Sequence, residues 1–179
     1  MLDLVFDIAF RSALAAILIT AAWHKLRDPI GFWQIVASYR IVPEALTRYV
    51  ARLVPIVEIA TAVCLVAIPS TAMPVFAAAF LWLVYAGAIV VNLLRGQTDI
   101  ECGCGGVSAD QKIHWGLVVR NGVLLMGTLA LLLPTSARAI TWFDYGTAGF
   151  AALILLSTYA TAEHLLRNAA LLDHEGTHP

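Results

Sequence analysis

Long apolar runs, each close to the length of a membrane-spanning helix, recur along this chain. A spanning helix needs roughly 20 mainly apolar residues, because the hydrocarbon core is about 30 Å thick and a helix rises about 1.5 Å per residue. Five runs approach or exceed that length: residues 4–26, 53–68, 71–94, 113–133 and 142–165. We therefore predict an all-α integral membrane bundle of five transmembrane helices, or four if one run does not cross. Residues 1–170 would form a single transmembrane domain and residues 171–179 a polar tail.

The connection between the first two runs, residues 27–52, carries a helical pattern of its own. Asp28 and Pro29 are typical of a helix start, because Asp accepts hydrogen bonds from free backbone N–H groups and Pro suits the first helical position. Apolar side chains then recur at helical spacing over residues 30–37, and Pro43 should interrupt the helix. We predict one or two short amphipathic helices on the membrane surface, with a solvated loop as the alternative.

Composition excludes several other classes of protein. Of the 179 residues, 60% are hydrophobic and 13% are charged, and the mean hydropathy is +0.82. A soluble domain carries about a quarter charged residues. The formal net charge of −1 provides no basic surface for nucleic acid, and three cysteines are too few for a disulfide scaffold. We expect lipid around the chain, no nucleic-acid partner and no bound cofactor.

The basic residues indicate which side of the membrane each loop faces. With five crossings, the connections after the first and third runs share one side with the C-terminus. That side holds eight basic residues: Lys25, Arg27, Arg40, Arg48, Arg52, Arg95, Lys112 and Arg167. The opposite side holds Arg138 alone. Because cytoplasmic loops are enriched in Lys and Arg, we predict that the basic side faces the cytoplasm.

The most unusual local sequence is a Cys-Gly-Cys motif between the third and fourth runs. Cys102 and Cys104 lie among three glycines within five residues, which predicts an exposed turn rather than a helix. A structural cysteine usually belongs to a packed core, and the local sequence offers none here. We interpret Cys102 and Cys104 as a redox pair that exchanges disulfides with a partner protein.

Two other interpretations of this motif stay open. The two thiolates supply half of a zinc coordination shell, to which His114 would add a third ligand. The cysteines would otherwise be incidental in a plain loop. Cys64, by contrast, lies inside the second apolar run and is interpreted as a packing residue.

Ionisable residues within the apolar runs form a second group of candidates. Such groups are unfavourable in a bilayer, so they tend to face the bundle interior and to be paired. Asp7 and Arg11 have the i, i+4 spacing of a helical ion pair. Glu58 and Arg120 lie at comparable depths from the same side, which predicts an ion pair between them; in the alternative, the Arg120 side chain extends to the membrane interface instead. Asn121 would add hydrogen bonds to that pair, as would Asn92, and we expect a structural, supporting role for the group.

His24 and Lys25 end the first run beside Trp23. An aromatic side chain with basic neighbours is typical of an anchor at the membrane–water interface. We therefore predict that His24 and Lys25 belong to such an interfacial anchor.

Several of these segments resemble one known family. The run from Asn92 to Gly106, with its Cys-Gly-Cys-Gly stretch, and the run Leu117–Asn121 resemble the methylamine-utilisation MauE family. Residues 23–29, and Pro55 with Glu58, are also similar to that family and to its DoxX-like relatives. The resemblance covers roughly residues 10–135, and its specific part is the Cys-Gly-Cys-Gly stretch.

The resemblance implies a multi-pass protein of the bacterial inner membrane in methylamine metabolism. MauE proteins act with a thioredoxin-like partner, MauD, in maturing the disulfide-rich periplasmic small subunit of methylamine dehydrogenase. By resemblance, Cys102 and Cys104 match the family's cysteine pair, and Arg120 and Asn121 match its Arg-Asn pair. A periplasmic client conflicts with the cytoplasmic side that the charges predict for the cysteines. The conflict is resolved if their loop dips between the helices, which we favour, if the charge count gives the wrong side, or if the protein receives reducing equivalents inside and a partner completes the path.

We therefore expect a thiol–disulfide accessory protein rather than a stand-alone enzyme with its own small-molecule substrate. Its task would be to assist disulfide formation, maturation or export of the dehydrogenase small subunit. The alternative is a membrane scaffold or chaperone that docks a partner without redox chemistry, for which the cysteines would be dispensable.

Overall fold

The computed structural model describes residues 3–103, 112–136 and 141–175, with side chains up to residue 168. Within these ranges the chain forms six helices: α1 (Leu4–Arg27), α2 (Pro29–Ser38), α3 (Glu44–Ala67), α4 (Met73–Leu94), α5 (Trp115–Ala130) and α6 (Trp142–Glu175). Four of them are long and apolar enough to cross a membrane, namely α1, α3, α4 and residues 142–168 of α6. The apolar helix α5 is shorter, at 16 residues. The prediction of an all-α membrane bundle is confirmed, with four candidate spans and one shorter apolar helix.

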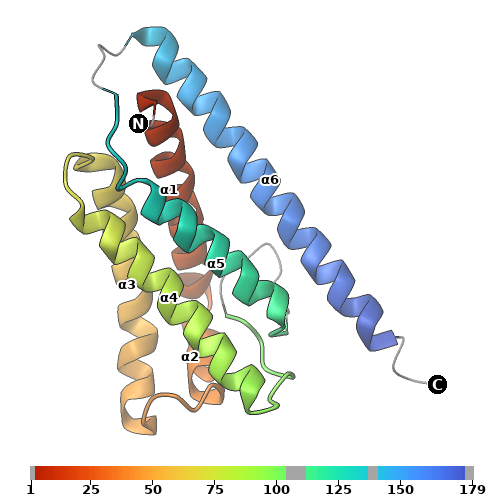
Figure 1. The fold of residues 1–179 in the computed structure, drawn as a ribbon. Coiled ribbons are helices and arrows are strands. Elements are labelled where there is room, and N and C mark those ends of the chain that lie inside the picture. The colour runs from red at the N-terminus through yellow and green to blue at the C-terminus, as the bar shows by residue number, and fades with distance from the viewer. Residues whose placement is uncertain (1–2, 104–111, 137–140, 176–179) are drawn as a thin grey trace.

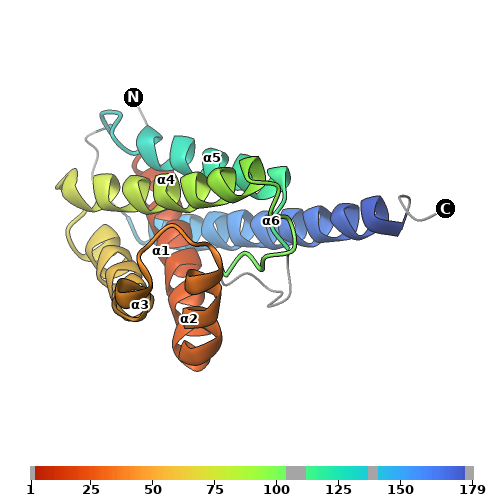
Figure 2. The same ribbon diagram turned by 90° about the horizontal axis from the view of Figure 1, so that it is seen from below.

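The helices form a bundle in which α1 packs against α3 and α6, while α4 packs against α3 and α5 (Figure 1). Helix α6 runs diagonally along one side, and its C-terminal part extends beyond the other helices (Figure 2). Helix α2, the end of α4, the start of α5 and the end of α6 all lie at one end of the molecule, which we call the α2 end. The N-terminus lies at the opposite end.

Local sequence explains where the first two helices begin. The Asp3 carboxylate accepts a hydrogen bond from the Val5 backbone N–H at 2.8 Å and so caps α1. Asp28 caps α2 in the same way, by accepting from the Gly31 N–H at 2.9 Å, with Pro29 in the first turn. The predicted helix start at Asp28 and Pro29 is therefore confirmed.

The predicted boundary of the second span was wrong. Helix α3 begins at Glu44, directly after Pro43, and not at residue 53. The connection therefore holds one short helix, α2, in agreement with the prediction of one or two. The extra turns are amphipathic: Thr47 is buried, whereas Arg48 is exposed and stacks over the Trp33 ring at 5.1 Å. A helix can therefore continue past the end of its apolar run when its charged side chains stay on the outer face.

The buried core lies where α1, α3, α4 and α5 meet. It contains Leu14, Leu18, Leu65, Val75, Ala78, Leu81 and Trp82, among others. The Trp82 indole N–H donates to the Thr128 hydroxyl at 3.0 Å and so ties α4 to α5. Many large apolar side chains remain on the outer face, including Phe76, Phe80, Val119, Val123 and Phe150. This distribution is the one expected for a bundle whose outer face is solvated by lipid.

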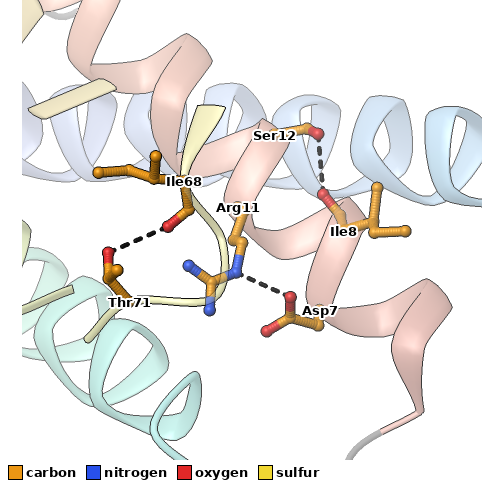
Figure 3. A network of polar contacts seen from close by, with 6 residues as sticks. All are labelled: Asp7, Ile8, Arg11, Ser12, Ile68 and Thr71. Atoms are coloured by element: carbon orange, nitrogen blue, oxygen red, sulfur yellow. Dashed lines mark hydrogen bonds and ion pairs between the residues drawn. The ribbon is translucent and has the colours of Figure 1, made fainter. Parts of the chain in front are cut away.

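A buried ion pair within α1 lies near the end of the bundle opposite α2. The Arg11 Nε donates to the Asp7 carboxylate at 2.7 Å, and both side chains are buried. Figure 3 shows the Arg11 guanidinium pointing toward the turn of Ile68 and Thr71, which joins α3 to α4. The predicted i, i+4 pair is confirmed.

Candidate functional site

The cysteine loop leaves and re-enters the fold through a short clamp. The Ile113 backbone N–H donates to the Ile100 carbonyl at 2.9 Å, and Glu101 and Lys112 form an isolated antiparallel bridge. The Lys112 ammonium also lies 2.8 Å from the Asp99 carboxylate. These contacts join residues 99–101 to residues 112–113 and so hold the backbone that leads to Cys102 at the α2 end.

Helix α2 and the residue after it form the surface on which this segment rests. The Tyr39 hydroxyl donates a hydrogen bond to the Cys102 carbonyl at 3.0 Å. Burial raises the pKa of the Tyr39 hydroxyl above its usual range, so the group stays protonated and remains a donor. Gly103 has a φ of +61°, and a Cβ there would lie 2.7 Å from the Ile35 Cγ2 atom. At position 103, only glycine therefore allows the backbone to lie this close to α2.

The cysteines differ in state and position. Cys102 is half-buried and disulfide-bonded, whereas Cys64 on α3 is a half-buried free thiol. Cys104 lies outside the described residues. In the part of the chain that the structure describes, no group of three or more His, Cys, Asp or Glu residues has the geometry of a metal site. His114 instead caps α5, because its Nδ1 accepts from the Gly116 backbone N–H at 3.1 Å.

An apolar groove of about 150 Å³ lies between α2, α3 and α4, with Cys102 and Gly103 in its wall. Its other lining residues include Phe32 and Ile35 of α2, Val54 of α3, and Tyr85 and Ala88 of α4. Cys102 and Gly103 therefore border a groove between three helices of the bundle.

Behind Tyr85 lies a buried charged cluster. The Lys25 ammonium is 2.6 Å from the Glu58 Oε1 atom, and the Tyr85 hydroxyl donates to the same oxygen at 2.6 Å. The Lys25 ammonium also lies over the Phe32 and Tyr85 rings, at 5.4 and 5.3 Å. Glu58 is fully buried and Lys25 is 4% exposed.

This cluster corrects two predictions. Glu58 pairs with Lys25 rather than with Arg120, and Lys25 is inside the bundle rather than at the interface as an anchor. The reason is that α1 packs directly against α3, so the last turns of α1 bring Lys25 to Glu58. Glu58 and Arg120 lie at similar depths, but α3 and α5 are not neighbours at the position of Glu58.

Arg120 instead joins α5 to α6. Its NH1 atom lies 2.7 Å from the Glu163 Oε1 atom, and both side chains are buried. Asn121 is buried beside it on α5, and among the described residues neither polar atom of its side chain has a hydrogen-bond partner. Asn92 donates to the Ala88 carbonyl within its own helix at 3.0 Å. The predicted hydrogen bonds from Asn92 and Asn121 to a Glu58–Arg120 pair are therefore wrong.

Sequence reasoning missed Lys25 and Glu163 as the partners of these charges. A signal was present, because Lys25 and Glu163 also lie within the predicted apolar runs. Once Asp7 is paired with Arg11, and Asp144 at the end of its run is set aside, the two carboxylates Glu58 and Glu163 and the two cations Lys25 and Arg120 can form two sets of pairs. The order of the helices in space decides between them, and the sequence does not give that order.

This chain is similar over most of its length to known proteins of one family. Residues 4–134 match the family model described as "Methylamine utilisation protein MauE". The methylamine utilization protein MauE of Paracoccus denitrificans is 38% identical over 164 residues, which cover 92% of this chain and 85% of that protein. The protein of the same name from Paracoccus versutus is 41% identical over 160 residues, covering 88% and 85%. That of Methylorubrum extorquens is 39% identical over 157 residues, covering 85% and 83%.

No solved structure matches the chain. The matched family model spans α1 to the end of α5 and so includes Lys25, Glu58, Cys102 and Arg120. By the match over most of its length, this chain belongs to the MauE family of methylamine utilisation proteins.

Proposed function

We propose that this protein is an inner-membrane accessory protein of methylamine metabolism in which Cys102 and Cys104 act as a redox pair. It would assist disulfide formation in the small subunit of methylamine dehydrogenase, together with a thioredoxin-like protein of the MauD type. The observation that carries the proposal is the disulfide-bonded Cys102, held by Tyr39 and the loop clamp at the end of a membrane bundle.

The chemistry is thiol–disulfide exchange. A thiolate of the reduced partner attacks one sulfur of the disulfide, and a mixed disulfide forms as the other sulfur leaves. A second thiolate of the partner then displaces the first cysteine, so the partner leaves oxidised and the cysteine pair of this chain is left reduced. The buried ion pairs support the site by fixing α1 to α3 and α5 to α6.

The test is maturation of the dehydrogenase in cells that depend on methylamine. We expect Cys102→Ser and Cys104→Ser to abolish accumulation of the mature small subunit while the variant proteins themselves remain in the membrane. Cys64→Ser is the matched control, because Cys64 is a free thiol on α3 outside the loop, and we expect normal maturation. Normal maturation in both loop variants would contradict the redox proposal and favour a scaffold that docks its partner without thiol chemistry.

A further inference from the structure

A cysteine pair that gives its disulfide to a partner is left reduced and must be oxidised again. The groove beside Cys102 has the position and the lining for that second reaction. It lies between three helices of a membrane bundle, two of them candidate spans, so an apolar molecule dissolved in the bilayer is the ligand class that fits it.

We propose, on the basis of the function proposed above, that this groove binds the ring of a lipid-soluble benzoquinone, which reoxidises the dithiol of Cys102. The groove volume is about 150 Å³. An apolar cavity of about that size accepts a six-membered ring such as benzene. Phe32 and Tyr85 present aromatic side chains in its wall, against which a flat ring can stack.

The redox step balances without any further reactant. The dithiol of Cys102 and its disulfide partner loses two electrons and two protons as the S–S bond forms. The quinone accepts two electrons and two protons and becomes the quinol, which leaves the groove for the bilayer. A phospholipid acyl chain fits the same apolar lining but accepts no electrons.

The buried cluster of Tyr85, Glu58 and Lys25, whose side chains can hold protons, adjoins the groove. Tyr85 lines it and donates to Glu58, which is also paired with Lys25. A quinone oxygen near Tyr85 would therefore lie one side chain away from a buried carboxylate and a buried ammonium.

The test uses the purified full-length protein in detergent micelles, reduced, freed of reductant and kept without oxygen. Decylubiquinone is added, and quinol formation is followed by absorbance while the thiol state of Cys102 is followed by alkylation. We expect one quinol for each disulfide formed, and none with Cys102→Ser. Ala88→Phe puts an aromatic ring into the groove, and we expect it to raise the quinone concentration for half-maximal rate about tenfold, equal to about 1.4 kcal/mol.

Val91→Phe is the matched control, because it places the same ring on the same helix at an exposed position outside the groove, and we expect wild-type kinetics. Val54→Phe fills the groove from α3 and replaces Ala88→Phe if that variant does not fold. Equal kinetics in the groove and control variants would overturn the proposal, as would the absence of quinol from the wild-type protein.

Failure of this inference is distinguishable from failure of the proposed function. If the reduced wild-type protein is oxidised by glutathione disulfide but forms no quinol, the cysteine pair is redox-active and the quinone site is wrong. If both cysteine variants mature the dehydrogenase normally in cells, the proposed function itself is wrong.

Discussion

Gly103 determines how closely the cysteine segment rests on α2. Its φ of +61° is unfavourable for other residues, and a Cβ would lie 2.7 Å from the Ile35 side chain. We expect Gly103→Ala to lift Cys102 away from α2 and to increase the rate at which the reduced Cys102 thiol reacts with a maleimide. The left-handed backbone alone is unfavourable for alanine by about 1–2 kcal/mol.

Gly96→Ala is the control that separates backbone strain from crowding. Gly96 has a φ of +73°, but a Cβ there meets no atom within 4 Å. In the Gly96→Ala variant, we expect the reduced Cys102 thiol to react with the maleimide at the wild-type rate. An equal increase in both variants would show that backbone strain, and not contact with α2, controls the thiol.

Glu58 is the residue whose charge keeps Lys25 stable inside the bundle. Glu58→Gln would leave the buried Lys25 ammonium without its counter-charge, which destabilises a protein by about 3–5 kcal/mol. We expect a marked loss of thermal stability in detergent micelles. Adding Lys25→Met to the same chain removes the unpaired charge, keeps an acceptor for Tyr85 and should restore much of the stability.

The exposed pair of Lys112 and Asp99 provides the comparison, because its side chains are 52% and 84% exposed. We expect Lys112→Gln to change stability by no more than about 1 kcal/mol. If Glu58→Gln proved as mild as Lys112→Gln, or if Lys25→Met failed to compensate, the buried pair would not hold α1 to α3 as the geometry indicates.

At the scale of elements, α6 packs along α1 through small side chains. Ala148 and Ala152 pack against Ala9, and their small side chains let the two helices approach closely. We expect Ala148→Leu to force α6 away from α1 and to destabilise the bundle by about 1–3 kcal/mol. Thermal unfolding in micelles measures this effect.

Gly149→Leu introduces the same side chain one position later, where a Cβ meets no atom within 4 Å. We expect a much smaller change in unfolding temperature, because the new side chain faces outward. Similar destabilisation by both variants would show that a leucine anywhere on this stretch of α6, rather than its contact with α1, accounts for the effect.

The sequence predicted most elements because each rule involved acts within one segment. Apolar runs located α1, α4 and α6, and the Asp28-Pro29 signal located the start of α2. The same runs failed for the start of α3, because Arg48 and Arg52 ended the apolar stretch without ending the helix. The sequence also could not predict the ion-pair partners of Glu58 and Arg120, because these depend on which helices are neighbours in space. For the cysteine site, the motif was visible in sequence, but its contact with Tyr39 and the apolar groove was not.

At the scale of the whole molecule, the positive charges and the cysteine segment share one end. The end of α1, helix α2, the start of α3, the end of α4 and the start of α5 all lie there, together with the end of α6 (Figure 1). Seven of the eight basic residues on the predicted cytoplasmic side belong to or flank these segments near that end: Arg27, Arg40, Arg48, Arg52, Arg95, Lys112 and Arg167. The eighth, Lys25, is buried against Glu58 and no longer counts as an interfacial charge.

The charge distribution therefore predicts that the α2 end faces the cytoplasm, and thiol trapping tests this in intact cells. In a Cys64→Ser background, a membrane-impermeant maleimide should label Cys102 only after both reduction and breakage of the membrane. Reduction is needed because Cys102 is disulfide-bonded. This result would exclude direct exchange with a periplasmic client, so that the disulfide would have to be carried onward by another protein, such as the proposed thioredoxin-like partner. Labelling of intact cells after reduction would instead place the cysteines outside, contradict the charge-based orientation, and allow direct contact with the dehydrogenase subunit.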